Sequence, residues 1–306
     1  IQLTTHTTSA MKASAVFSLG RLNYEERITY TEQALEAVSK AITNDKNSDL
    51  YANSLKAVIS LKQLNQSLNI DNQITKILSL TDDAILHVAS TTYSHHQDVI
   101  TNNISLKLLN YLSSTNPNNK GTINNIDHGL SRYLKTGELD KVILFIESYL
   151  ITNDKHITIN DFRCVVRKLL DQDKKHLNYL ITKWLTSKQI ILCRSVLDIF
   201  ENIHGEEFTI QADLNWLGND TDKRIFAARK AIGWLFHRPV TAASFIVSLI
   251  ETAHDDEIKL LEGLLFYPLL QSYAGKVQKY LRELNKEHNE KIYDAVSKAL
   301  LHLDEY

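Results

Sequence analysis

The chain has 306 residues, 43% of them hydrophobic, and a formal net charge of -2 at pH 7. These values argue against a disordered chain and against a general attraction to nucleic acid or anionic membranes. No run of about eighteen apolar residues could span a bilayer, and Cys164 and Cys193 have neither disulfide-framework nor zinc-site spacing. We expect a cytoplasmic protein without a membrane anchor, a metal or a cofactor.

Glycine and proline are scarce, which bears on the fold class. The chain has nine glycines and three prolines, whereas average usage would give about twenty and about fifteen. Few turns need these residues, so the composition predicts an all-α fold with long helices. The Thr/Ser-rich start from Ile1 lacks the basic and apolar parts of a signal peptide. We expect residues 1–20 to be a flexible N-terminal segment of a longer protein.

Residues 21–112 carry helical periodicity and predict an N-terminal helical subdomain. Within 23–43, apolar and threonine side chains recur three and four residues apart, which places them on one helical face. They are Ile28, Thr31, Leu35, Val38 and Ile42. The stretch 47–68 and two further segments, about 72–90 and 97–112, have the same pattern. Residues 113–125 then bring proline, glycine and five asparagines together, which predicts a linker or long loop.

Residues 126–306 read as helix pairs separated by short joints. A leucine precedes each joint, at Leu134, Leu170, Leu235 and Leu265, with unequal spacing. This recurrence resembles the helical hairpins of HEAT and tetratricopeptide repeats, which bury their apolar faces against neighbouring hairpins. The resemblance implies a C-terminal helical-hairpin repeat region and an irregular α-solenoid. The alternative is an irregular α-helical bundle.

Basic residues cluster between positions 155 and 194, nine of them against three acidic residues. A basic groove here could receive an acidic peptide or a nucleic-acid backbone; the alternative is a solvated face of mixed charge. The candidate binding residues in and beyond this segment are Arg163, Arg167, Lys174, Lys175, Arg224, His237 and Arg238.

The joint "FHRP" and the segment 204–222 are the two places where a loop could carry recognition. Pro239 suits the first turn of a helix, so "FHRP" is explained as a joint, yet joining two helices does not require His237 and Arg238. Segment 204–222 contains two glycines and predicts a long extended loop. Its Trp216 is either an anchor for a partner or a side chain folded back onto the core.

Two short patterns raise the alternative of an enzyme. His254-Asp255 is similar to the metal-binding pair of the His-Asp phosphohydrolases, which use a metal to activate water; otherwise Asp255 or Asp256 caps a helix. Arg282 and His288, with five residues between them, are similar to the arginine and histidine of HEPN ribonucleases, where such groups serve acid–base catalysis and phosphate stabilisation.

The absence of a complete catalytic constellation in the sequence favours an interaction function. We expect a scaffold or adaptor module within a larger protein or complex, with a protein partner of acidic character. The alternatives are an all-α phosphodiesterase or ribonuclease, and nucleic-acid backbone binding through residues 155–194. The sequence leaves the oligomeric state open.

Overall fold

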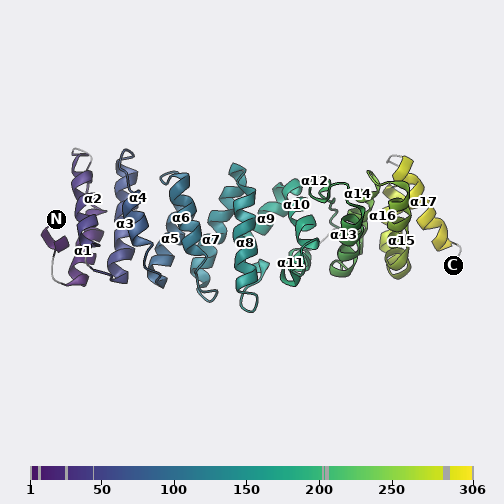
Figure 1. Ribbon diagram of the computed structural model, residues 1–306, viewed down its shortest axis with the longest axis horizontal. Helices are drawn as coiled ribbons and strands as arrows, with labels where there is room; N and C mark the ends of the chain where they lie inside the picture. Colours follow the sequence, from purple (N-terminus) through teal and green to yellow (C-terminus); the bar gives the residue numbers. More distant parts are fainter. Residues whose placement is uncertain are drawn as a thin grey trace. The chain divides into compact units, whose positions relative to one another are not determined.

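The computed structural model describes residues 2–5, 8–24, 27–43, 45–201, 203, 207–284 and 290–304. Within these ranges the regular structure is helical and no strand forms, so the predicted all-α class is confirmed (Figure 1). The chain divides into two compact units, Ile1–Phe145 and Ile146–Tyr306. Helix α8 (Leu139–Thr152) contains residues of both.

The first unit is an array of helices in two layers, drawn in purple to teal in Figure 1. Helices α1, α3, α5 and α7 form one layer, in which each helix packs against the next, and α2, α4 and α6 cover it. The elements are η1 (Gln2–Thr5), α1 (Ser9–Leu19), α2 (Tyr30–Ala41), α3 (Ser48–Leu64), α4 (Asp71–Ile77), α5 (Asp83–His95), α6 (Asn102–Leu112), α7 (Lys120–Tyr133) and η2 (Leu134–Thr136).

Two hydrogen bonds between the neighbouring helices α5 and α7 join residues at nearly the same sequence separation. Asn125 Nδ2 donates to Ser90 Oγ across 3.1 Å, and Arg132 Nη1 donates to the Ser94 carbonyl across 2.9 Å. The residues of these pairs are 35 and 38 positions apart. Helices α1, α3, α5 and α7 also begin at similar intervals, at residues 9, 48, 83 and 120. Each helix of the layer therefore finds its partners mainly in the next one, as in repeat proteins.

Two expectations for the first unit need correction. Residues 9–19, expected to be flexible, form α1, because Ala13, Val16 and Leu19 lie on one helical face and are buried. The second half of the expected loop 113–125 belongs to α7, which begins at Lys120. Ile123 is buried at 1% exposure, and burial of this apolar face outweighs the weak helix propensity of the asparagines.

The second unit continues as helices joined by short turns. Helices α11, α13, α15 and α17 contact one another in succession, and α14 packs on α13, α15 and α16. The elements are η3 (Ile159–Asp161), α9 (Arg163–Gln172), α10 (Lys174–Leu185), α11 (Ile190–Glu201), α12 (Leu214–Leu217), α13 (Thr221–Trp234), α14 (Pro239–Ile250), α15 (Asp255–Leu264), the π-helical turn η4 (Leu265–Leu270), α16 (Gln271–Leu284) and α17 (Glu290–Asp304).

A non-helical segment, residues 207–213, runs between α10 and α14. The main-chain N–H groups of residues 210 to 213 donate alternately to side chains of α14 and α10. The pairs are Ile210 with Ser244 (3.0 Å), Gln211 with Asn178 (3.1 Å), Ala212 with Ser248 (2.8 Å) and Asp213 with Thr182 (2.8 Å). Two residues of extended chain advance about 6.6 Å and four helical residues about 6 Å. Acceptors four apart on each helix therefore match every second N–H.

Candidate functional site

Two of the predicted binding residues, Arg163 and Arg167, lie on α9. Arg163, Val166, Arg167 and Leu170 follow the spacing i, i+3, i+4, i+7 and occupy one helical face. Together with Asn160, Ile199 of α11 and Ile203, they line a hollow of about 520 Å³. We call this hollow the α9 groove.

Helix α9 carries two apolar stripes, although one stripe is enough to pack it against the core. Val165 and Leu169 are buried at 1% and 2% exposure and anchor the helix in the core. Val166 and Leu170 lie on the groove side and are only half-buried. Ile199 completes the apolar floor at 2% exposure. The groove therefore offers apolar surface that the described part of the chain leaves partly exposed.

Both arginines of the groove keep their charge accessible to solvent. Arg163 Nε donates to the Asn160 carbonyl across 3.3 Å. Arg167 Nε lies 3.3 Å from Asp171 Oδ2, with 86% and 57% of the two side chains exposed. An exposed pair of this kind contributes less than about 1 kcal/mol, so exchanging Asp171 for an outside carboxylate would cost little.

The "FHRP" joint lies behind the wall of this groove. Arg238 Nη2 donates to the carbonyl of Ile203, a lining residue of the α9 groove. Arg238 thereby holds the end of the wall in place instead of reaching outward. Next to it, His237 is half-buried, its ring meets Phe236 edge-on, and both of its ring nitrogens are buried without a hydrogen-bond partner among the described residues. Burial, and then the charge of Arg238, lower the pKa of His237.

Replacing His237 with leucine is expected to make the second unit more resistant to acid. As the pH falls below about 6.5, the unfolded chain binds a proton at this histidine, whereas the folded state with its lowered pKa does not yet bind it. Stability is therefore lost as the pH falls from the unfolded pKa to the folded one. Leucine removes this loss. In urea denaturation between about pH 7 and pH 5, the free energy of unfolding of the variant should therefore fall less with decreasing pH than that of the original chain.

The control for this experiment is His254→Leu, which changes an exposed histidine of the same unit. Its pH profile should follow the original chain. If the stability of His237→Leu fell with pH as steeply as that of the original chain, the lowered pKa of His237 would not explain the acid sensitivity.

Arg224 was predicted to bind a partner, but the structure places it in the core. Its side chain is 5% exposed and its Nη1 lies 3.4 Å from Glu257 Oε1, whose side chain is 2% exposed. Its Nη2 also donates to Thr252 Oγ1 across 2.7 Å. Arg224 lies on the face of α13 that holds the buried Ala227, Ala228 and Ala231, so it points into the core and cannot contact a partner.

Lys174 and Lys175 lie at a different place from the two arginines. Both are exposed in the first turn of α10 and line a separate hollow of about 470 Å³ with residues 178 and 211–215. Lys174 Nζ lies 5.6 Å from the centroid of the Phe208 ring. The two hollows share no described lining residue, so the basic residues do not form one continuous groove in the described second unit.

Trp216 is folded back onto the protein. Its Nε1 donates to Thr186 Oγ1 across 3.0 Å, and its ring meets Tyr179 edge-on at 5.7 Å. Lys223 Nζ lies 4.8 Å from the ring centroid. The half-buried indole therefore makes its described contacts within the second unit, as the alternative of a side chain folded back onto the protein predicts.

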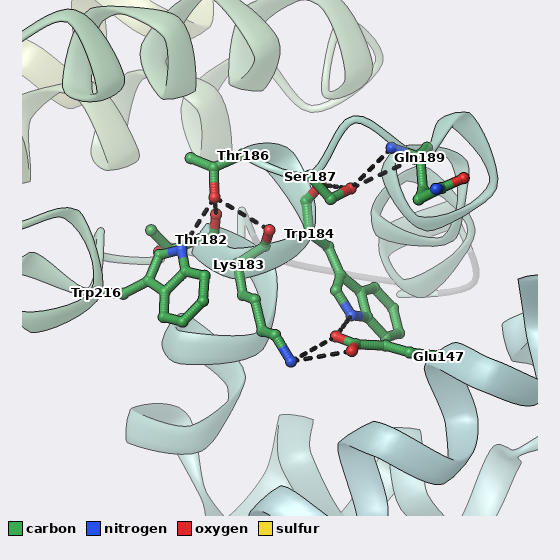
Figure 2. A network of polar contacts seen from close by, with 8 residues as sticks. All are labelled: Glu147, Thr182, Lys183, Trp184, Thr186, Ser187, Gln189 and Trp216. Atoms are coloured by element: carbon green, nitrogen blue, oxygen red, sulfur yellow. Dashed lines mark hydrogen bonds and ion pairs between the residues drawn. The ribbon is translucent and has the colours of Figure 1, made fainter.

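Figure 2 shows the polar network that surrounds this tryptophan. Glu147 accepts hydrogen bonds from Lys183 Nζ (2.9 Å) and Trp184 Nε1 (2.8 Å). The Thr186 hydroxyl that binds Trp216 itself donates to main-chain carbonyls of α10. Because Trp184 is completely buried, this network fixes α10 against α8 and α12. Lys183 is thus a structural member of the basic segment.

Of the four residues proposed for catalysis, the three that the structure describes lie at the start of α15 and near the end of α16. His254 is the exposed N-cap of α15 and makes no side-chain cap; Asp255 is the first residue of that helix, so the expected aspartate cap is corrected. Arg282 is exposed in the last turn of α16, and His288 lies outside the described residues. Over the described ranges, no three His, Cys, Asp or Glu side chains are grouped to hold a metal.

Two lining residues of the α9 groove were not anticipated from the sequence. Ile199 and Ile203 lie at and just after the end of α11, about thirty residues beyond α9, and the sequence around them gives no sign of a groove. The second apolar stripe of α9 was the sequence feature from which the groove could have been predicted.

Comparisons with known proteins give no relative. Among the described helices, none has both the length and the apolar content needed to cross a membrane. No protein-family model matches the chain, and neither a curated protein nor a solved structure does.

Proposed function

We propose that this protein is an interaction module that binds an acidic, amphipathic segment of a partner protein in the α9 groove. The observation that carries the proposal is the composition of the groove: two exposed arginines above an apolar floor of Val166, Leu170 and Ile199. A larger assembly that contains the partner fits the expected role as a scaffold or adaptor.

The apolar part of the groove favours a protein segment over a nucleic-acid backbone. A nucleic-acid backbone binds mainly through phosphate contacts to cations and gains little from half-buried valine and leucine. An amphipathic helix, by contrast, lays its apolar face into such a groove with side chains three or four residues apart. The floor supports a segment with two or three apolar side chains.

The charge of the groove selects among such segments. Arg163 and Arg167 are on the same face of α9, one turn apart, and no described lining residue is acidic. Arginine forms paired hydrogen bonds with carboxylates, and these contacts would add to the burial of apolar area. We therefore infer glutamate or aspartate beside the apolar residues of the partner segment.

A selection from a random peptide-display library, with the full chain as bait, tests this function. We expect enriched peptides to combine acidic residues with apolar residues at helical spacing. Their affinity should fall about tenfold in Arg163→Ala and in Arg167→Ala, since a hydrogen bond to a charged group contributes about 1.5–3 kcal/mol and about 1.4 kcal/mol is a factor of ten. Val166→Asp should abolish binding by placing a buried charge on the groove floor.

Lys188→Ala is the matched control, because it removes an exposed positive charge of the same basic segment outside the groove. It should leave peptide affinity unchanged. Peptides that bind all of these variants equally would contradict the proposal. Tighter binding of a DNA oligonucleotide, with a steep loss of affinity as salt is added, would instead support the nucleic-acid alternative.

A further inference from the structure

A hollow of about 450 Å³ lies in the first unit, over α1, α3 and α5. Its charged and hydrogen-bonding side chains come from α3, α5 and the residues just after α1 and α5, and are Arg21, Lys56, Ser60, His87, Thr91, Thr92 and His96. We call this site the basic hollow. No described residue that lines it is a carboxylate, although the whole chain carries two more acidic than basic residues.

The packing of α1 on α3 brings the two permanent cations to the same hollow. Gly20 ends α1 so close to α3 that a Cβ there would lie 2.6 Å from the Ala57 Cα. This approach places Arg21 beside the turn of α3 that carries Lys56. The Arg21 guanidinium lies 5.0 Å from the centroid of the Phe17 ring, a cation–π contact that orients it. Lys56 is exposed, and no ion pair to it occurs among the described residues.

Helix α5 and the residue after it contribute the two histidines. Gln63 Nε2 lies 2.9 Å from His96 Nδ1; an amide NH₂ group donates, so Nδ1 accepts and the neutral ring carries its proton on Nε2. Burial lowers the pKa of His96, and an anion nearby would favour the protonated ring. His87 is exposed on the same helix one turn before Thr91.

We propose that the basic hollow binds a phosphomonoester dianion, carried either by a small organic phosphate or by a phosphorylated side chain of a partner protein. Arg21, Lys56 and the two histidines together supply the positive charge and N–H donors that a phosphate group needs. The volume lies within the range of about 300–1,000 Å³ that small-ligand sites have. The hollow is confined and holds two permanent cations, whereas a polynucleotide track needs many phosphate contacts. The site is separate from the α9 groove and does not depend on its function.

Isothermal titration calorimetry of the full chain tests the proposal. The probes are inorganic phosphate, a phosphoserine peptide, the same peptide without phosphate, and single-stranded DNA. We expect saturable binding of both phosphate probes and none of the unphosphorylated peptide. A phosphoserine peptide that binds more tightly than inorganic phosphate would indicate a phosphoprotein as the source. Equal affinity would show that the hollow contacts only the phosphate group, as expected for a small organic phosphate.

Variants locate the binding at the hollow. Lys56→Ala and Arg21→Ala should each weaken phosphate binding about tenfold or more, while Lys46→Ala, an exposed lysine of the same unit outside the hollow, should not. Both substituted side chains are exposed, and thermal unfolding will confirm that the variants fold. In the unsubstituted chain, NMR signals of the His96 ring should shift on addition of phosphate and stay unchanged with chloride at equal ionic strength.

The proposal is overturned if neither phosphate probe binds saturably, if Lys56→Ala binds phosphate as the original chain does, or if single-stranded DNA is preferred with a steep dependence on salt.

Discussion

Replacing Arg224 with alanine is expected to lower the free energy of unfolding of the second unit by about 3–5 kcal/mol, the range found when one partner of a buried ion pair is removed. The Glu257 carboxyl group, at 2% exposure, would be left in the core without the guanidinium that contacts it. Thr252 would lose the 2.7 Å hydrogen bond from Arg224. Urea denaturation, with hydrogen exchange of α13 and α15 as a local measure, gives the loss directly.

Two further variants separate the ion pair from the side chain's bulk. Arg224→Met with Glu257→Leu removes both charges and should recover much of the lost stability, because an apolar pair of similar volume often replaces a buried ion pair without cost. Arg229→Ala, an exposed arginine on the same helix, should change stability by less than about 0.5 kcal/mol. A double variant as unstable as Arg224→Ala would contradict this explanation.

Replacing Gly129 with alanine is expected to destabilise the first unit by a net amount of about 1 kcal/mol. The new Cβ would lie 2.4 Å from Tyr93 Cδ1 and 2.7 Å from Cε1. Tyr93 is 1% exposed and its ring stacks on Tyr133 with centroids 5.3 Å apart, so it cannot move aside. Overpacking of this kind costs about 1–3 kcal/mol, which outweighs the gain of up to about 1 kcal/mol that alanine brings to a helix.

Gly121→Ala is the matched control on the same helix, because a Cβ there meets nothing within 4 Å. Only the propensity gain remains, so this variant should be as stable as the original chain or more stable by up to about 1 kcal/mol. Urea denaturation of both variants will show whether each substitution raises or lowers the free energy of unfolding. If Gly129→Ala proved as stable as Gly121→Ala, the close packing of α7 on Tyr93 would be wrong.

The sequence predicted the helical class because periodicity and low glycine content are local properties of the chain. It did not separate buried from exposed cations. Arg224 is followed by Ala227, Ala228 and Ala231 on one face, and this pattern of small residues was the signal that the arginine faces the core. Arg163 and Arg167 are instead followed by a second apolar stripe on α9, which the charge count alone did not reveal.

The remaining differences come from contacts between residues far apart in sequence. The asparagines near residue 120 favour a loop by their own propensities, and the burial of Ile123, Ile126 and Leu130 explains the helix. Likewise, Ile199 belongs to the α9 groove through the packing of the second unit. The basic hollow combines α1, α3 and α5, so single-helix patterns could not bring its residues together.

The segment between α10 and α14 has a consequence for which mutations the protein tolerates. Helix side chains bind the main chain of residues 210 to 213, at sites that alternate between two helices, and every residue other than proline supplies the same N–H. Substitutions at the exposed Thr209 and Gln211 should therefore be accepted readily. Inserting or deleting one residue would turn each N–H toward the wrong helix. The residue types of this segment can therefore vary in evolution, whereas its number of residues is constrained.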